Sequence, residues 1–196
     1  MLFDADGVLQ GVRAGWLEQL TAAGGARGEE FVLAVFAAER SCLTGQDFAV
    51  AMQEVLRQFA ISRPLAEVID PDYWIQVDPA MVAAVSVVRS RGISCGLATN
   101  QQNLRGGHMR SALYVDDIFD AQFYSWELGF AKPDPDYFRA IVERVAGQPE
   151  RMLFIDDNAD NVEGAREVGL HAELFPAGGG VAALRPLLAA YGVSLD

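Results

Sequence analysis

The stretch "LFDADGVL" (residues 2–9) runs from an apolar segment straight into two carboxylates, Asp4 and Asp6. On a strand, residues two apart point to the same face, so these two carboxylates would lie side by side. Two negative charges that close repel each other unless a cation, a proton-transfer role or exposure to solvent accounts for them. The apolar segment is short, because only residues 1–3 precede Asp4. The stretch therefore predicts a first strand that ends at these carboxylates, and the rest of the chain must decide among the three explanations.

Helical and strand-like runs alternate along the second half of the chain. Helical spacing marks residues 81–92, 134–147, 161–169 and 181–192, and apolar runs mark residues 93–100, 121–125, 151–157 and 171–175. Asp134 and Pro135 are typical of the first turn of a helix. Apolar strands that alternate with helices favour a parallel sheet covered on both faces. We expect an α/β fold with a three-layer, Rossmann-like core.

The segment between residues 12 and 78 breaks this alternation. Its runs "GWLEQLTAAG", "EEFVLAVFAAERS" and "GQDFAVAMQEVLRQFAI" have helical spacing, with no strand predicted between them. An all-helical insertion after the first strand is the simplest interpretation. We therefore expect a core domain of residues 1–11 and 79–196 and a helical cap domain of residues 12–78.

Polar residues follow three of the predicted strands. In a parallel sheet, binding sites lie outside the carboxyl ends of the strands, which meet at one edge. We therefore expect the residues at these strand ends to converge, although they are far apart in sequence: Asp4 and Asp6, Thr99 and Asn100, and Asp156 and Asp157.

Composition and charge argue against several classes of protein. The 196 residues carry a formal net charge of −12, which makes nucleic acid an improbable partner. We find no apolar run of about 18 residues and no signal-peptide pattern, so we expect a cytoplasmic protein without a membrane partner. Cys42 and Cys95 are interpreted as buried thiols, and two histidines are too few to favour a histidine-based zinc site. The oligomeric state is left open.

Four separated stretches match a known pattern, and they do so in its order. They are residues 2–9, "LATN" (97–100), the lysine of "FAKPDPDYF" (130–138) and "LFIDDNADNVEGA" (153–165). The chain resembles the haloacid dehalogenase-like (HAD) hydrolase superfamily, and its helical insertion is similar to that family's small helical cap. The residues of the last two motifs are similar to those of bacterial sugar-phosphate phosphatases and of the amino-terminal domain of soluble epoxide hydrolase.

The resemblance implies hydrolysis of a phosphate ester through an aspartyl-phosphate. Asp4 would attack phosphorus as a carboxylate that needs no base. Asp6 would protonate the leaving oxygen and then take a proton from the hydrolytic water. The resemblance also implies residues that bind the phosphate: Gly7 and Val8 through their N–H groups, Thr99 through its hydroxyl, Asn100 beside it, and Lys132 through its charge.

The resemblance further implies Mg²⁺ as cofactor, which would relieve the repulsion between the carboxylates. The ligands would be Asp4, the backbone carbonyl of Asp6, and Asp157. Asp156 would lie behind the ligands, and Asn161 would orient Lys132 or an acid.

Specificity is expected to lie in the cap and in the loop after the second motif. Trp16 ranks first for substrate contact, with Arg13, Thr44 and Gly45 as further candidates in the cap. Arg105 and His108 follow the second motif and are within reach of a substrate, unless that stretch is only a basic loop. The partner expected is a small phosphorylated metabolite such as a sugar phosphate.

Other functions remain open at this point. A phosphomutase would use the same chemistry, and a non-catalytic binding protein would use the same fold. A haloacid dehalogenase is disfavoured, because a halide leaves unprotonated and needs no acid at Asp6. A calcium loop that starts at Asp156 is disfavoured because Asn161 stands where such a loop requires glycine.

Overall fold

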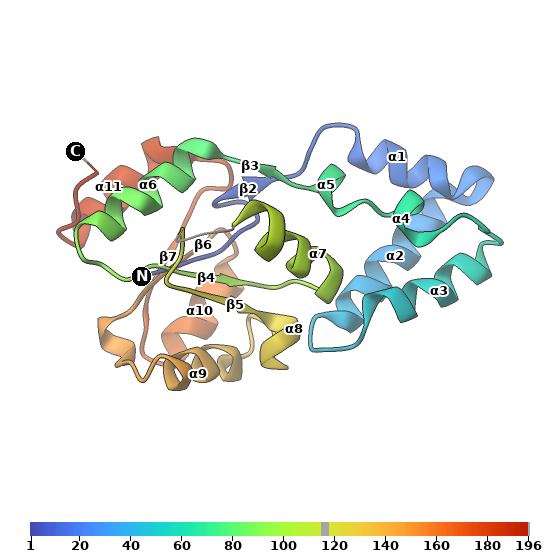
Figure 1. Cartoon of the computed structure of the whole chain (residues 1–196). Coiled ribbons are helices and arrows are strands. Elements are labelled where there is room, and N and C mark those ends of the chain that lie inside the picture. Colours follow the sequence, from blue (N-terminus) through green and yellow to red (C-terminus); the bar gives the residue numbers. More distant parts are fainter. Residues whose placement is uncertain (115–117, 196) are drawn as a thin grey trace.

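The computed structural model describes residues 1–114 and 118–195. Residues 115–117 and 196, which belong to the predicted core segment 79–196, lie outside the described residues. An α/β core forms one end of the molecule, and a group of helices extends from it as a cap (Figure 1). Among the described residues, no helix combines the length and the apolar character needed to span a membrane.

The core is built on a parallel five-stranded sheet in the order β5-β4-β1-β6-β7. Its strands are β1 (Leu2–Phe3), β4 (Gly96–Thr99), β5 (Ala121–Tyr124), β6 (Leu153–Asp156) and β7 (His171–Leu174). The short first strand predicted from the sequence is the middle strand of the sheet. Backbone hydrogen bonds extend its pairing at both ends, from Gly96 to the Met1 carbonyl and from Asp4 to the Ile155 carbonyl.

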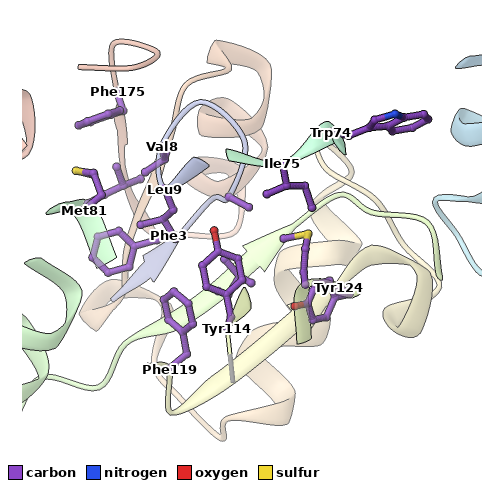
Figure 2. Packing of buried hydrophobic residues seen from close by; sticks show 14 of the residues in the cluster. Phe3, Val8, Leu9, Trp74, Ile75, Met81, Tyr114, Phe119, Tyr124 and Phe175 are labelled. Atoms are coloured by element: carbon purple, nitrogen blue, oxygen red, sulfur yellow. The ribbon is translucent and has the colours of Figure 1, made fainter. Parts of the chain in front are cut away.

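Alternate residues of the central strands pack against different layers of helices. Phe3, Leu97 and Ile155 are in register and belong to one apolar cluster with α6 (Pro79–Ser90) and α11 (Gly180–Ala190). Their neighbours Leu2, Ala98 and Phe154 belong to a second cluster with α9 (Pro135–Arg144) and α10 (Ala159–Glu167). Figure 1 shows these two pairs of helices on opposite faces of the sheet, and Figure 2 shows part of the first cluster. The predicted three-layer α/β fold is confirmed.

The cap is helical, as expected, and α2 packs between α1 and α3. Its elements are α1 (Trp16–Ala23), η1 (Gly25–Arg27), α2 (Gly28–Cys42), α3 (Phe48–Gln58), α4 (Leu65–Val68) and α5 (Pro71–Trp74). A small antiparallel ladder of β2 (Gln10–Gly11) and β3 (Gln76–Val77) joins the two linkers between core and cap. This ladder was not predicted, because two-residue strands leave no periodic signal. The domain boundaries at residues 12 and 78 fall beside it.

The remaining core elements follow the second and third motifs. They are α7 (Asn103–His108), the π-helical turn η2 (Met109–Leu113), α8 (Ser125–Leu128) and η3 (Pro149–Arg151). Asp134 caps α9, as predicted, by accepting a hydrogen bond from the backbone N–H of Asp136 at 2.9 Å. Helix α7 begins shortly after β4 and faces the cap, so it connects the second motif to the boundary between core and cap (Figure 1).

Candidate active site

The carboxyl ends of three neighbouring strands bring the predicted residues together. Asp4 follows β1, Thr99 ends β4, and Asp156 ends β6. All three side chains are buried, with exposed fractions of 7%, 1% and 0% for the whole residues. The convergence expected from a parallel sheet therefore occurs, although the three residues are about 50 to 150 positions apart in sequence.

Lys132 stands at the centre of a group that we call the Lys132 cluster: Asp4, Lys132, Asp156 and Asn161. The Lys132 ammonium lies 2.7 Å from Oδ1 of Asp4 and 2.6 Å from Oδ2 of Asp156. It also donates to the Ala98 carbonyl at 2.9 Å, which uses all three of its protons. Asn161 donates to both oxygens of Asp156 at 3.1 Å. Asn161 thus orients an acid of the site rather than Lys132 directly.

The Lys132 cluster carries more negative than positive charge. Burial raises the pKa of Asp4, Lys132 opposes this rise, and the neighbouring Asp156 adds to it. Burial likewise raises the pKa of Asp157, with a further contribution from Asp156. For Lys132, burial lowers the pKa, but the two carboxylates outweigh burial and raise it above its usual value. The lysine is therefore held charged, while the acids around it lack a second cation.

A divalent cation fits this deficit. Asp4, Asp156 and Asp157 each offer a carboxylate oxygen, and these atoms lie within 4.8 Å of one another. Oxygen ligands of this kind are the ones that Mg²⁺ prefers. Asp156 already accepts hydrogen bonds from Lys132, Asn161 and the backbone of Asn158, so Asp4 and Asp157 are the carboxylates better placed to bind metal.

Gly7 explains how the first motif approaches the fourth. Its φ is +79°, and a Cβ at this position would lie 2.0 Å from Oδ2 of Asp157. Any other residue would force the Asp157 carboxylate to shift. The N–H of Gly7 donates to the Gln10 carbonyl at 2.8 Å, and that of Val8 to the Ala5 carbonyl at 3.3 Å. Both donors serve the turn itself, and their contact with phosphate stays a prediction.

Asp6 belongs to a different group, which we call the Arg105 cluster: Asp6, Gln10, Gln101 and Arg105. Two nitrogens of the Arg105 guanidinium donate hydrogen bonds to Asp6, one to each carboxylate oxygen, both at 2.7 Å. Gln10 and Gln101 donate to the same carboxylate at 2.9 and 2.8 Å. Sequence reasoning placed Arg105 within reach of a substrate, but did not pair it with Asp6.

The Arg105 cluster holds Asp6 as a carboxylate. Its enclosure raises the pKa of Asp6, but the charge and hydrogen bonds of Arg105 outweigh this and lower the pKa to about 2. The side chain of Arg105 is 8% exposed and that of Asp6 is 42% exposed, so the carboxylate opens toward solvent while its partner is buried. In this arrangement Asp6 is ionised, and any role in proton transfer stays a prediction.

The residues of the second motif have separate tasks. Thr99 accepts a hydrogen bond from Gln101 at 3.1 Å, which leaves its own hydroxyl proton to donate to a phosphate. Asn100 instead joins the loop of Lys132: it donates to the Lys132 carbonyl and accepts from the Lys132 N–H, both at 2.8 Å. Asn100 thereby fixes the backbone that presents Lys132, and its contact with phosphate stays a prediction.

The cap candidates differ in how near they lie to these clusters. Trp16 lines a cavity of about 480 Å³ that also contacts Asp6 and Arg105. Thr44 and Gly45 do not line this cavity, and a Cβ on Gly45 would lie 3.3 Å from the Trp126 carbonyl of the core.

The two remaining candidates, Arg13 near the first linker and His108 at the end of α7, do not line this cavity. Arg13 lies 3.7 Å and His108 3.8 Å from the carboxylate of Asp72.

The match to a known family agrees with this geometry. The sequence model of the haloacid dehalogenase-like hydrolases matches residues 1–169, which contain both clusters and the cap. The chain belongs to this family. It is therefore an enzyme of a hydrolase family, and the resemblance predicted from the four motifs is confirmed.

Several proteins are similar to this HAD-like hydrolase. Phosphatase MT3486 of Mycobacterium tuberculosis is 34% identical over 121 residues, which cover 60% of this chain and 56% of the relative. A phosphorylated carbohydrates phosphatase of Thermotoga maritima is 25% identical over 96 residues, covering 49% of this chain and 44% of the relative. The matched stretches thus span about half the length of these curated relatives.

Solved structures share the fold across the whole molecule. The HAD family enzyme BT-2542 of Bacteroides thetaiotaomicron, in complex with magnesium and inorganic phosphate, superposes with a TM-score of 0.78 at 21% identity, covering 90% of this chain and 93% of that one. A HAD phosphatase of Thermococcus onnurineus gives a TM-score of 0.71 at 20% identity, covering 95% and 96%. At these identities the likeness establishes the fold, including the attached cap.

Proposed function

We propose that this enzyme hydrolyses small phosphate monoesters with Mg²⁺, through an aspartyl-phosphate formed on Asp4. The observation that carries the proposal is the buried carboxylate of Asp4, held 2.7 Å from Lys132 and beside Asp157. An ionised carboxylate is a nucleophile that needs no base, and Lys132 and a cation among the two further acids would oppose the rise in pKa that burial causes at Asp4. Phosphatases among the relatives, and the magnesium and phosphate bound by a structural neighbour, support the same function.

In the first step, an oxygen of Asp4 attacks phosphorus and the bond to the leaving oxygen breaks. Lys132 offsets the charge that gathers around Asp4, and Thr99 donates its hydroxyl to a phosphate oxygen. The leaving oxygen takes a proton from Asp6, which must first be protonated and released from Arg105. Mg²⁺, held by Asp4, the Asp6 carbonyl and Asp157, would supply a positive charge that draws the phosphate to this acidic site.

In the second step, water attacks the phosphorus of the aspartyl-phosphate. Asp6 accepts the proton of this water, and Asp4 is regenerated as phosphate leaves. A pKa of about 2 keeps Asp6 ionised but makes it a weak base, so its contacts with Arg105 must loosen for this step as well. The cap would exclude bulk water and contact the leaving group, and a small phosphorylated metabolite is the class of substrate proposed; the sequence motifs and the carbohydrate phosphatase relative make a sugar phosphate the first ester to compare with others.

The nucleophile is tested by Asp4→Asn, with release of phosphate from p-nitrophenyl phosphate as the measurement. The variant keeps the size of the side chain, and we expect turnover to fall to the background rate while the protein stays folded. Asp136→Asn, at an exposed surface pair with Arg139, is the matched control and should keep wild-type turnover. Near-normal turnover by Asp4→Asn would exclude the aspartyl-phosphate.

The metal is tested separately. Chelation should abolish turnover and added Mg²⁺ should restore it, whereas Ca²⁺ should not, because calcium takes more and longer bonds to oxygen. If Ca²⁺ supports turnover as well as Mg²⁺ does, the proposed magnesium site is wrong.

A further inference from the structure

A cavity of about 480 Å³ lies between the core and the cap, next to the carboxylate of Asp6. Its core side includes Asp6, Gln101 and Arg105, and Asp6 lies two residues after the proposed nucleophile in the first motif. Its volume lies within the range of roughly 300–1,000 Å³ that is usual for small-molecule sites. In the proposed reaction Asp6 protonates the leaving oxygen, so this cavity is where the rest of the substrate would lie.

The cap side of the cavity is aromatic. Trp16 lies with its ring centre 5.9 Å from that of Phe36 and 5.7 Å from that of Trp74. Figure 2 shows Trp74 beyond Ile75, pointing away from the packed cluster around Phe3. Trp16 and Phe36 are only half-buried, so each keeps part of its apolar surface open.

Aliphatic side chains complete this wall. Leu43 of the cap lines the cavity, and Val12 lies at its edge with 57% of its surface exposed. Apolar surface left open around a cavity beside a reactive group indicates an apolar ligand.

Most polar groups of the wall are already engaged. Asp6, Gln101 and Arg105 hydrogen-bond to one another, and Asn100 is bonded to the backbone of Lys132. Among the described charged side chains of the wall, this leaves Glu39 and Arg40, both on α2, to meet a ligand, and the indole N–H groups of Trp16 and Trp74 are further donors.

That polar wall suits a sugar poorly. A sugar would bring several hydroxyl groups into the cavity, and each one buried without a partner would cost binding free energy.

We propose that the preferred substrate is a phosphate monoester of an apolar alcohol, whose hydrocarbon part packs against Trp16, Phe36 and Trp74. This rests on the proposed function, and it replaces a sugar by a hydrocarbon as the leaving group. The phosphate still occupies the site beside Asp4, and the alcohol oxygen lies at Asp6, so the chemistry of the two steps is unchanged.

The test uses esters of primary alcohols, so that the reactivity of the leaving group stays nearly constant. Phosphate release with Mg²⁺ is measured for butyl, hexyl and octyl phosphate and for glucose 6-phosphate. Each methylene that becomes buried should raise kcat/KM about fourfold, until the chain fills the cavity. Octyl phosphate should therefore exceed glucose 6-phosphate at least tenfold. A flat alkyl series, or a preference for glucose 6-phosphate, would overturn the proposal.

Two variants test whether the apolar side chains that line the cavity cause the preference for longer alkyl phosphates. Val12→Ser changes an exposed residue that lines the cavity, so the fold should survive, and the preference for octyl over butyl phosphate should fall severalfold. Phe36→Leu removes aromatic surface with little loss of volume and should act in the same direction. Leu33→Ser is the matched control, because Leu33 is 68% exposed on α2 and does not line the cavity. An unchanged preference in both cavity variants would count against the aromatic wall as the binding surface.

p-Nitrophenyl phosphate separates the two proposals. If it is hydrolysed but octyl phosphate is not preferred over the sugar phosphate, the hydrocarbon pocket is wrong and the phosphatase stands. If no ester is hydrolysed in the presence of Mg²⁺, the proposed function itself fails, and the substrate class fails with it.

Discussion

The Lys132 cluster contains Asp4 and the Arg105 cluster contains Asp6. Both aspartates come from the same short motif, yet their pKa values shift in opposite directions. In the Lys132 cluster, one cation faces Asp4 and Asp156, and burial raises the pKa of Asp4. In the Arg105 cluster, one cation faces one carboxylate, and the pKa of Asp6 falls to about 2. The difference is one of charge balance: the Lys132 cluster lacks a positive charge, whereas the Arg105 cluster is neutral by itself.

This contrast explains why one cluster is suited to a metal and the other is not. A cation bound among Asp4 and Asp157 would relieve repulsion that the fold leaves unbalanced. At Asp6, Arg105 already supplies the positive charge with two hydrogen bonds, and proton transfer by this carboxylate is part of the proposed mechanism. The spacing of two residues along the chain thus separates two tasks.

Of the changes predicted here, Lys132→Met should have the largest effect on stability, because it removes the cation of the Lys132 cluster. The ammonium of Lys132 is 1% exposed, so its loss leaves two buried carboxylates with no cation between them. Breaking a buried ion pair in this way should lower the free energy of unfolding by about 3–5 kcal/mol, measured by urea denaturation without metal. Turnover should also be lost.

Arg139→Met provides the matched control for that measurement. Its pair with Asp136 is exposed, at 59% and 49%, and removal of such a pair should change stability by no more than about 0.5 kcal/mol. Equal stability of the two variants would show that the Lys132 cluster is not a buried, strongly coupled group.

Asp6→Asn should break only the proton-transfer half of the contrast. The variant keeps the backbone carbonyl and the nucleophile, and it should lose about 100- to 10,000-fold in the rate of aspartyl-phosphate formation from an alkyl phosphate. With p-nitrophenyl phosphate, whose phenolate leaves without a proton, this first step should be nearly unaffected. The second step should be slow for both esters, so rapid mixing should show a burst of nitrophenolate.

The two esters act as controls for each other in that experiment. If Asp6→Asn slows the first step equally for both and gives no burst, Asp6 is a structural partner of Arg105 and not an acid–base group.

The sequence predicted the Lys132 cluster better than the Arg105 cluster, for a physical reason. Asp4, Thr99 and Asp156 end neighbouring parallel strands, and the topology of such a sheet forces them to one edge. Arg105 reaches Asp6 from a helix, and which way a helical side chain points depends on packing that one sequence does not display.

The sequence predicted that the cap is helical, but not which of its side chains line the cavity. Helical spacing predicted three helices of the cap, and Trp16, ranked first for substrate contact, is one of the cap residues that line the cavity, although that contact stays a prediction. Phe36 was missed as an aromatic partner of Trp16, and Thr44 and Gly45 do not line the cavity. Which cap face meets the core depends on the two linkers, which are held by the β2–β3 ladder. Pairing of two-residue strands is a long-range property that local patterns do not carry.

The last prediction compares these two aspartates with a third one, Asp120, which does not belong to the group of acids that could hold a metal. Asp120 accepts hydrogen bonds from Arg89 at 2.7 and 3.1 Å and from the backbone N–H of Cys95 at 2.7 Å. The hydrogen bonds from Arg89 hold the pKa of Asp120 below its ordinary value of 3.8, with help from Cys95. Asp120 therefore resembles Asp6 in having an arginine partner, but it lies at the surface, 41% exposed.

A lowered pKa in the folded state means that the charged form of Asp120 stabilises the fold above pH 3.8, and that this contribution is lost as the pH falls below that value. Asp120→Asn should therefore lower the free energy of unfolding at pH 7 by less than about 1 kcal/mol, because solvent screens an exposed pair. At pH 3 the difference from wild type should shrink, as measured by urea denaturation at both values. A difference that stays constant or grows toward acid would mean that Asp120 acts through packing. The effect of an arginine partner would then have to be reconsidered at Asp6 as well, because there too two hydrogen bonds from an arginine are held to lower the pKa of the carboxyl group.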